Sequence, residues 1–362
     1  MSENLRRTPL YETHLRSGAR LVPFAGWEMP VQYTGVVAEV KAVREATGIF
    51  DVSHMGRVWV EGPQAEAFLD YLTVNDVSKL TDGQGQYSLM CYESGGVVDD
   101  IIVYRISATG FFVVINAGNR DKDLAWMREK LAGFDATLTD RSDETGLIAV
   151  QGPKALELLR GMTQDAIWMG RFQIATVKLG TAGVDLARTG YTGEDGAELV
   201  CRADQAALLW DSLIAAGALA CGLGARDALR LEAALPLYGH EMDETVNPYE
   251  ARLGWVVKLD KAANFIGKDV LQAVKASGPA RKCVGITLEG KGIPREGYPV
   301  CVVGGAPVGH ITSGTFSPTV GRGVAMARVE SAYAKTGTAL EVEIRGARHA
   351  ATVAALPFYK NV

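Results

Sequence analysis

The stretch Val60-Glu-Gly-Pro-Gln-Ala-Glu-Ala-Phe-Leu-Asp-Tyr-Leu-Thr73 recurs in altered form as Val150-Gln-Gly-Pro-Lys-Ala-Leu-Glu-Leu-Leu-Arg-Gly-Met-Thr163. Both stretches predict a strand, a Gly-Pro turn and an amphipathic helix, because proline suits the first turn of a helix and the following apolar residues recur at helical spacing. Gly-Pro is a common helix start, yet the shared Val, Ala, Leu and Thr positions favour an internal repeat. The repeat predicts two related α+β units that face each other around one site.

A β-meander is expected after the first copy of the repeat. Its strands are predicted over 86–92, 97–106 and 110–115, with a hairpin turn at Glu93-Ser-Gly-Gly96, because a Gly-Gly pair between two apolar runs favours a hairpin. The later elements expected from the same signals are a helix over 121–131, strands within 177–201 around a turn at 193–196, and a helix over 224–235 that Pro236 ends.

The composition of the sequence changes at Arg281. Short runs of β-branched residues, broken by Gly and Pro, begin there, as in Gly304-Gly-Ala-Pro-Val-Gly309. This composition indicates a separate small β-barrel or sandwich. A polar, helix-like link over 262–280 puts a domain boundary near residue 275. The fold class is therefore predicted as α+β, with one domain from residues 1–50 and 140–260, a second from 51–139 that contains the meander, and a C-terminal domain from 275–362.

Length and composition bound the class of protein. A chain of 362 residues is long for one hydrophobic core, and its net charge of -5 and scattered Lys and Arg carry no electrostatic signature for nucleic acid. The five cysteines form no CxxC pair, which argues against a disulfide framework and a zinc ribbon and fits a reducing compartment. Residues 1–20 show no signal-peptide pattern, and no window approaches the roughly 20 apolar residues of a membrane span. We expect a cytoplasmic protein, although a processed organellar enzyme has the same composition.

The strand expected over 97–106 contains two adjacent carboxylates, Asp99 and Asp100, in an otherwise apolar run. Side chains alternate between the faces of a strand, so Asp100 shares one face with Tyr104 and apolar residues, whereas Asp99 shares the other with Arg105. We therefore expect solvent on the side of Asp99, and Asp100 to be the one acidic group among apolar neighbours.

An isolated carboxylate in apolar surroundings persists only if it is paired, protonated or facing a ligand. Two interpretations of Asp100 remain open, since it either bonds backbone amides near the turn at Gly95-Gly96 or faces a cavity that holds a ligand. The sequence has no dinucleotide or phosphate loop, no histidine pair at metal spacing and no Gly-x-Ser-x-Gly elbow. These absences favour a metal-free group-transfer site built from carboxylates, arginine and aromatic residues around a bound cofactor.

Five motifs follow one another along the chain: Asp51-Val-Ser-His-Met-Gly56, Gly95-Gly-Val-Val-Asp-Asp100, Asn116-Ala-Gly118, Gly190-Tyr-Thr-Gly-Glu-Asp-Gly-Ala-Glu198 and Ala225-Arg-Asp-Ala-Leu-Arg-Leu-Glu232. Their joint order and spacing resemble the T-protein (aminomethyltransferase) family of the glycine cleavage system. The resemblance runs from Thr8-Pro-Leu-Tyr11 to Pro357-Phe358 and so covers nearly the whole chain. It implies a three-domain cloverleaf, in which two related α+β domains surround a central folate funnel and a β-barrel or sandwich follows.

The resemblance also implies an activity in glycine catabolism and one-carbon metabolism. An aminomethyl group arrives on the dihydrolipoyl arm of a lipoylated H-protein, which is the expected partner. Tetrahydrofolate, the acceptor substrate, takes the one-carbon unit as 5,10-methylene-tetrahydrofolate, and ammonia is released. No metal, nucleic acid or membrane has a part in this expectation.

The site residues are carried over from the same resemblance. Asp100 matches the family's key carboxylate beside the reacting pterin nitrogen and is the expected catalytic residue. Glu198 matches an acidic residue that holds donors of the folate, and Arg226 matches a folate-contacting arginine. Tyr191 and Trp255 are expected to pack on the folate through their aromatic faces. The complete expected folate-binding set is Met55, Tyr87, Asp100, Val114, Asn116, Phe172, Tyr191, Glu198, Arg226, Trp255 and Tyr359.

Three alternatives belong to other functional classes. A folate-dependent demethylase would use a similar pocket to take a methyl group from sulfur or oxygen. A non-catalytic folate-binding protein of iron–sulfur maintenance usually carries a Lys-Gly-Cys-type motif, which this sequence lacks. A purely structural β-rich module would leave Asp100, Glu198 and Arg226 without a shared purpose.

Overall fold

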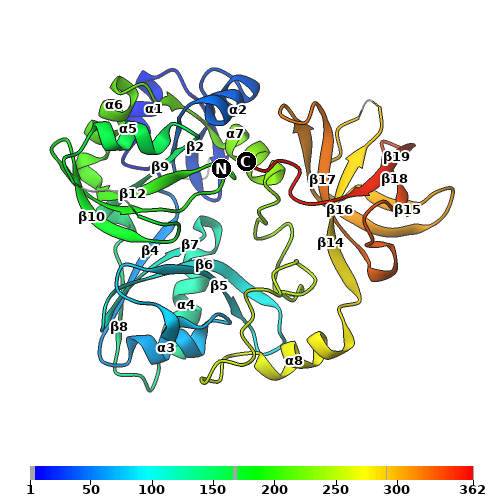
Figure 1. Cartoon of the computed structure of the whole chain (residues 1–362), viewed down its shortest axis with the longest axis horizontal. Coiled ribbons are helices and arrows are strands. Elements are labelled where there is room, and N and C mark those ends of the chain that lie inside the picture. Colours follow the sequence, from blue (N-terminus) through cyan, green and yellow to red (C-terminus); the bar gives the residue numbers. More distant parts are fainter. Residues whose placement is uncertain (1–4, 166–168, 291, 362) are drawn as a thin grey trace. The chain divides into compact units, whose positions relative to one another are not determined.

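The computed structural model describes residues 5–165, 169–290 and 292–361 (Figure 1). Over these residues the strands form a two-stranded hairpin, a six-stranded sheet, a five-stranded sheet and a closed barrel. The chain divides into two compact units, each assembled from segments that are separate in the sequence. The first comprises Met1–Asp70, Asp76–Ser88 and Ile101–Arg226, and the second comprises Tyr71–Asn75, Leu89–Asp100 and Asp227–Val362.

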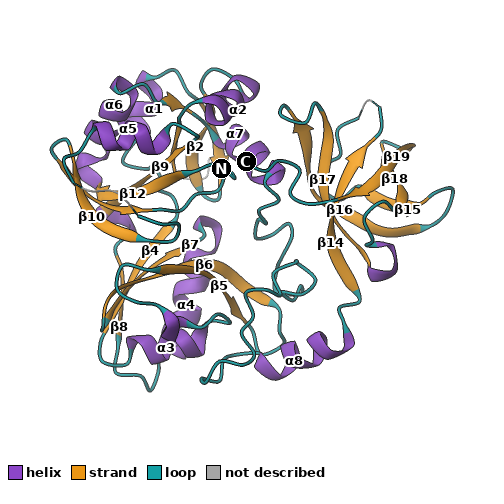
Figure 2. Cartoon of the chain, viewed as in Figure 1, coloured by secondary structure: helices purple, strands orange, loops and turns teal. Residues whose placement is uncertain are grey.

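The six-stranded sheet of the first unit has the order β10-β11-β12-β9-β3-β13. Helix α5 packs on β12 and helix α6 on β9 (Figure 2). The core of this region includes Ile148, Leu199 and Trp210. The strands are β3 Gly48–Asp51, β9 Thr145–Gln151, β10 Ile174–Leu179, β11 Ala182–Ala187, β12 Gly196–Arg202 and β13 Leu219–Ala220. The helices are α1 Tyr11–Arg16, α2 Val36–Glu45, α5 Ala155–Gly161 and α6 Ala206–Ala215, and the hairpin consists of β1 Arg20–Phe24 and β2 Trp27–Gln32.

The five-stranded sheet has the order β5-β6-β7-β4-β8 and contains the predicted meander. Strands β5 and β6 both run from one compact unit into the other, because the division falls after Ser88 and after Asp100. The elements are β4 Gly56–Glu61, β5 Gly85–Cys91, β6 Val97–Ser107, β7 Gly110–Ile115 and β8 Thr137–Asp140, with helices α3 Ala65–Leu72 and α4 Arg120–Lys130.

Both copies of the sequence repeat fold as strand, turn and helix, so this prediction is confirmed. The turn glycines, Gly62 and Gly152, have φ values of 140° and 135°, which disfavour residues with a side chain. Each glycine also leaves no room for a Cβ atom, which would lie 2.7 Å from the Cα of Ala136 at Gly62 and 2.3 Å from the carbonyl oxygen of Ala46 at Gly152. The repeat therefore depends on glycine for its tight turn and on the following proline for the helix start.

The C-terminal strands form a closed barrel, which decides between the two predicted alternatives of barrel and sandwich. Its strand order is β14-β17-β16-β15-β18-β19 (Figure 1). Residues such as Ile286, Ala327 and Val342 form its core. The strands are β14 Arg281–Leu288, β15 Pro299–Val302, β16 Pro307–Ser317, β17 Arg322–Glu330, β18 Ala339–Ile344 and β19 Ala347–Ala354. Helices α7 Leu223–Glu232 and α8 Lys268–Ser277 precede it.

Buried charges hold the end of α7 on the barrel within the second unit. Arg230 donates to Glu241 at 2.9 Å and to the hydroxyl of Ser313 at 2.9 Å, and Ser317 donates to Glu232 at 2.5 Å. A buried charge is tolerated when partners satisfy it in this way, and removal of one partner is costly. This network fixes the segment that links α7 to the barrel.

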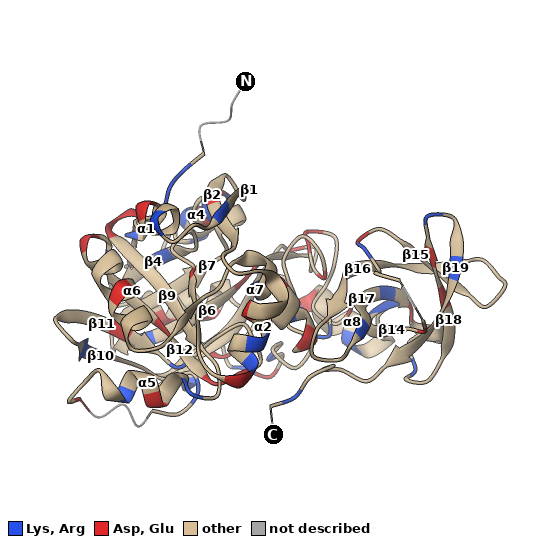
Figure 3. Cartoon of the chain, turned by 90° about the horizontal axis from the view of Figure 1, so that it is seen from above, with Lys and Arg blue, Asp and Glu red and all other residues tan. Residues whose placement is uncertain are grey.

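The fold class predicted from the sequence, α+β with a C-terminal barrel, is confirmed. Positions of Lys and Arg and positions of Asp and Glu are both scattered along the helices and strands (Figure 3). All five cysteines are buried and free, and burial raises the pKa of the Cys91 thiol to about 12. No helix within the described residues is long and apolar enough to cross a bilayer.

Candidate active site

Asp99 and Asp100 lie on opposite faces of β6, as alternation predicts, but the expectation for solvent is wrong. Asp99 is fully buried, with 0% of its surface exposed, whereas Asp100 is partly exposed. The prediction placed solvent beside Asp99 because Arg105 shares its face. Arg105 lies near the far end of the strand, where it pairs with Glu66. Asp99 lies nearer the start of the strand, where the side chains of the same face are buried. The accessible carboxylate is therefore Asp100.

The face of β6 that carries Asp100 continues onto β7. Ile102 shares this face, and its ladder partner is Val114, which is 8% exposed. Asn116 follows the last residue of β7 and Met55 precedes the first residue of β4, and these two strand ends pair with each other. The ladder thus lines up Met55, Val114 and Asn116, three residues of the expected folate-binding set.

Strand β5 adds further predicted residues to the same face. A Cβ atom on Gly85 would lie 2.4 Å from the ring of Tyr104, so Gly85 and, two residues along, Tyr87 point to the side of Tyr104. The N–H of Gly85 donates to the carbonyl of Phe172 at 2.6 Å. Phe172 has φ of 61°, and 38% of its surface is exposed. A bulky residue held in this strained conformation by its neighbours is typical of functional sites.

Glu198, on β12, is anchored by a chain of two hydroxyl groups. The hydroxyl of Thr189 donates to Oε2 of Glu198 at 2.7 Å. The hydroxyls of Tyr104 and Thr189 are 2.8 Å apart. These bonds join the five-stranded sheet to the six-stranded sheet. They connect Tyr104, on β6, with the carboxylate of Glu198, which was predicted to hold the folate.

Arg226, near the start of α7, is the cation of the site. Its central carbon lies 4.9 Å from the centre of the Tyr191 ring. Its Nη1 atom is buried and has no hydrogen-bond partner among the described residues. Burial lowers the pKa of the guanidinium, while the charge of Glu198 favours the charged form. A buried N–H without a partner is costly, so this nitrogen is suited to donate a hydrogen bond to an oxygen of a ligand.

His54 is a buried neighbour that the sequence interpretation did not single out. It is 3% exposed, and its Nδ1 atom has no hydrogen-bond partner within the described part of the chain. Burial lowers the pKa of His54 to about 4, and the charge of Arg226 acts in the same direction. The ring meets Phe24 edge-on, with centroids 5.7 Å apart. His54 is therefore a neutral imidazole at pH 7 next to the cation of the site.

Three predicted residues belong to the second compact unit: Asp100, described above, and also Trp255 and Tyr359. Trp255 is 63% exposed, and the N–H of Tyr359 donates to the carbonyl of Glu232 at 2.8 Å. Both lie outside the contacts described above, and their role in binding folate stays a prediction.

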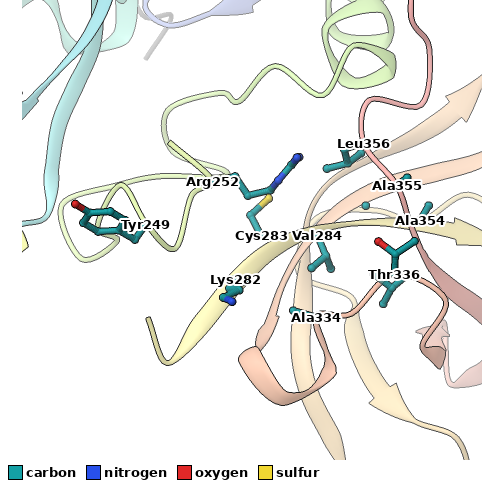
Figure 4. A pocket seen from close by; sticks show the side chains of 12 residues that line it. Tyr249, Arg252, Lys282, Cys283, Val284, Ala334, Thr336, Ala354, Ala355 and Leu356 are labelled. Carbon is teal, nitrogen blue, oxygen red and sulfur yellow. The ribbon is translucent and has the colours of Figure 1, made fainter. Parts of the chain in front are cut away.

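A pocket of about 210 Å³ lies in the second unit beside the barrel (Figure 4). Its walls include Tyr249, Arg252, Cys283 and Thr336 and contain none of the predicted site residues. Burial raises the pKa of the Cys283 thiol to about 12, so this cysteine is not a reactive thiolate.

Contacts in the first unit connect four residues of the predicted set through Gly85, Tyr104 and Thr189: Phe172, Glu198, Arg226 and Tyr191. The arrangement offers a carboxylate acceptor, a guanidinium donor and aromatic faces, which suits a planar ligand with both donors and acceptors on its edge. No group of three or more His, Cys, Asp or Glu side chains in the described residues is placed to hold a metal ion.

Three residues of this site were not predicted: His54, Tyr104 and Thr189. His54 stands inside the quoted motif 51–56, and Thr189 directly precedes the motif 190–198. Strand alternation already put Tyr104 on the face of Asp100. The signals were present, but the contacts span 85 residues between Tyr104 and Thr189, which spacing alone does not reveal.

Two family models match the chain: the GCVT N-terminal domain over residues 10–261 and the glycine cleavage T-protein C-terminal barrel domain over residues 281–360. An aminomethyltransferase of Symbiobacterium thermophilum is 50% identical, over 100% of this chain and 99% of the relative. Another, from Shouchella clausii, is 50% identical over the full length of both chains. The crystal structure of the glycine cleavage system aminomethyltransferase T from Bartonella henselae matches with a TM-score of 0.93 at 35% identity, covering 99% of each chain.

The fold and these full-length relatives define a class of protein, the enzymes that transfer one-carbon groups. The chain belongs to the glycine cleavage T-protein family. The family resemblance predicted from the five sequence motifs is thereby confirmed.

Proposed function

We propose that the chain is the tetrahydrofolate-dependent aminomethyltransferase of a glycine cleavage system. It takes the one-carbon unit of an aminomethyl group from the dihydrolipoyl arm of a lipoylated H-protein, and its products are 5,10-methylene-tetrahydrofolate, ammonia and the H-protein with a free dihydrolipoyl arm. The observation that carries the proposal is a pair of groups: the buried Nη1 of Arg226, which has no hydrogen-bond partner among the described residues, and the anchored carboxylate of Glu198.

The edge of a pterin offers hydrogen-bond donors next to a carbonyl acceptor. In the proposed complex Glu198 accepts from the donors and Arg226 donates to the acceptor, so the pair recognises both kinds of group at once. Tyr87, Phe172 and Tyr191 supply aromatic surface for the planar rings. The proposed folate-binding set also includes Met55, Val114 and Asn116, and Trp255 and Tyr359 are further proposed folate-binding residues.

Asp100 is the proposed catalytic residue, because it is the accessible carboxylate on the same face of β6 as Tyr104. Tetrahydrofolate supplies the amine nitrogen that takes up the one-carbon unit. The carboxylate stabilises the positive charge that develops on the transferred carbon as ammonia leaves, and it accepts the proton released by the attacking nitrogen. Proximity of the two substrates supplies much of the remaining rate enhancement.

The proposal is tested by incubating the protein with tetrahydrofolate and an aminomethyl-loaded lipoyl carrier protein, and by assaying ammonia and 5,10-methylene-tetrahydrofolate together. Equal amounts of both products, dependent on both substrates, are expected. Methylation of tetrahydrofolate from a sulfur or oxygen donor without ammonia would instead establish a demethylase. Folate binding without turnover of either donor would establish a non-catalytic binding protein.

A further inference from the structure

The hydroxyl chain behind Glu198 has a defined direction. A threonine hydroxyl carries one hydrogen, and the Thr189 hydroxyl gives it to Oε2 of Glu198 at 2.7 Å. At the contact of 2.8 Å with Tyr104, Thr189 is therefore the acceptor and the phenol is the donor. Hydrogen bonding thus runs from Tyr104 to Thr189 to Glu198.

Tyr104 is held so that its hydroxyl has little freedom. The residue is 1% exposed, and its ring stacks on Phe112 with centroids 5.8 Å apart and an interplanar angle of 17°. On the other side the backbone of Gly85 lies so close that a Cβ atom there would clash with the ring. Burial, and then the charge of Glu198, raise the pKa of Tyr104 well above 10, so the phenol keeps its proton at every physiological pH.

Thr189 is fixed through its backbone. Its N–H donates to the carbonyl of Ala187 at 2.9 Å, and its own carbonyl accepts from Nε2 of the fully buried Gln151 at 3.1 Å. The amide oxygen of Gln151 in turn accepts from the hydroxyl of Thr192 at 2.9 Å. The threonine hydroxyl is consequently presented to Glu198 from a rigid position.

We propose that Tyr104 and Thr189 are positioning residues, which hold the carboxylate of Glu198 in the orientation that binds the folate. This inference rests on the proposed function. Thr189 is the hydrogen-bond donor to Glu198 within the described residues, and it occupies Oε2 alone. Oε1 and the partly exposed side of the carboxylate stay available for the two donors of a pterin edge. Hydrogen bonds to a charged group are strong, and a chain of them is mutually reinforcing.

The test measures initial rates with the full-length protein, tetrahydrofolate and the aminomethyl-loaded carrier protein. In Thr189→Val we expect the KM for tetrahydrofolate to rise about tenfold and kcat to change less than about twofold. The reason is that the hydroxyl chain from Tyr104 through Thr189 to Glu198, here called the relay, acts on binding and not on the reacting atoms. Thr189→Ser keeps the hydroxyl and is expected to restore a KM within about twofold of wild type. Tyr104→Phe is expected to raise the KM about threefold.

A double-mutant cycle separates a relay from two independent structural effects. If Tyr104 acts through Thr189, Tyr104→Phe adds nothing to the KM once Thr189 is valine. The matched control is Thr176→Val, since the Thr176 hydroxyl donates to Asp185 at 2.6 Å on the exposed part of the same sheet. This control is expected to keep the wild-type KM and kcat, and thermal unfolding of every variant shows that it is folded.

Three outcomes would overturn the relay: a wild-type KM in Thr189→Val, a Thr189→Ser variant as weak as the valine variant, or full additivity of the two substitutions. If Thr189→Val does not fold, Tyr104→Phe and Thr189→Ser decide by the same KM criterion. An inactive wild-type protein that also fails to bind tetrahydrofolate would overturn the proposed function itself. If the wild-type enzyme is active and one of the three outcomes is observed, the relay alone is overturned and the proposed function stands.

Discussion

The guanidinium of Arg226 lies over the ring of Tyr191, with 4.9 Å between its central carbon and the ring centre, while its Nη1 atom stays buried without a partner among the described residues. The aromatic face orients the planar cation by a cation–π contact and leaves its edge for hydrogen bonds. The Nη1 of Arg226 is therefore placed to donate a hydrogen bond to an acceptor atom of a ligand.

This geometry predicts that Arg226→Lys is not a conservative change. Lysine keeps the charge but loses the planar fork, so we expect the KM for tetrahydrofolate to rise about tenfold or more with a smaller effect on kcat. Steady-state kinetics check the prediction. The control is Arg202→Lys, because Arg202 pairs with Asp204 on the exposed surface of the same unit and is expected to be neutral. A wild-type KM in Arg226→Lys would show that the fork makes no contact with the folate.

Asp100→Asn keeps the shape of the side chain and removes its charge. We expect tetrahydrofolate binding to be retained and turnover to fall by about a hundredfold or more, because the carboxylate stabilises charge in the transition state. Binding by fluorescence titration and kcat from ammonia release are measured in parallel. Asp82→Asn, an exposed aspartate paired with Arg105, is the control. Near-normal turnover in Asp100→Asn would remove Asp100 from the chemistry.

The buried imidazole of His54 predicts a pH dependence of stability. Its pKa is lowered from 6.5 to about 4, so the unfolded chain binds more protons than the folded chain between these values. The contribution of His54 is therefore constant above pH 6.5, and stability falls by about 3 kcal/mol as the pH drops from 6.5 to 4. Urea unfolding at pH 7 and pH 4 should show that His54→Gln lacks this part of the loss. Identical losses in the two proteins would contradict it.

The turn of the second repeat gives a prediction about stability alone. In Gly152→Ala the new methyl group would meet the carbonyl oxygen of Ala46, and φ of 135° is unfavourable for alanine, so a loss of at least about 2 kcal/mol is expected. Gly161, at the end of α5, has open space around it and serves as the control, with a change within about 1 kcal/mol. Thermal unfolding measures both. Equal melting temperatures for the two variants would contradict the requirement for glycine.

Local patterns predicted much of the fold. The Gly-Pro repeat, the meander and the helix over 121–131, observed at Arg120–Lys130, follow from periodicity and turn residues within a short window. Closure of the barrel joins β14 to β19 across more than 50 residues, and composition alone left a sandwich equally open. Pairing at such separations depends on tertiary packing, which is not encoded in a local pattern.

In the candidate site, too, local patterns predicted the strand geometry but not the tertiary contacts. Alternation correctly separated Asp99 from Asp100, because side-chain period is a local property of a strand. Which face is covered depends on the layers packed against it, and there the prediction for Asp99 was wrong. The link from Tyr104 to Thr189 depends on the meeting of two sheets, so it became visible only in three dimensions.

The interleaving of the two compact units along the chain has a consequence for protein dissection. The family models divide the sequence between residues 261 and 281, whereas the long final segment of the second unit begins at Asp227, and its remaining pieces, 71–75 and 89–100, lie inside the first half. A single break in the polypeptide therefore cannot separate the two units, because any fragment that contains the whole of one unit also carries pieces of the other. Expression of the barrel half alone leaves out parts of β5 and β6, and truncation mapping cannot assign an activity to either unit.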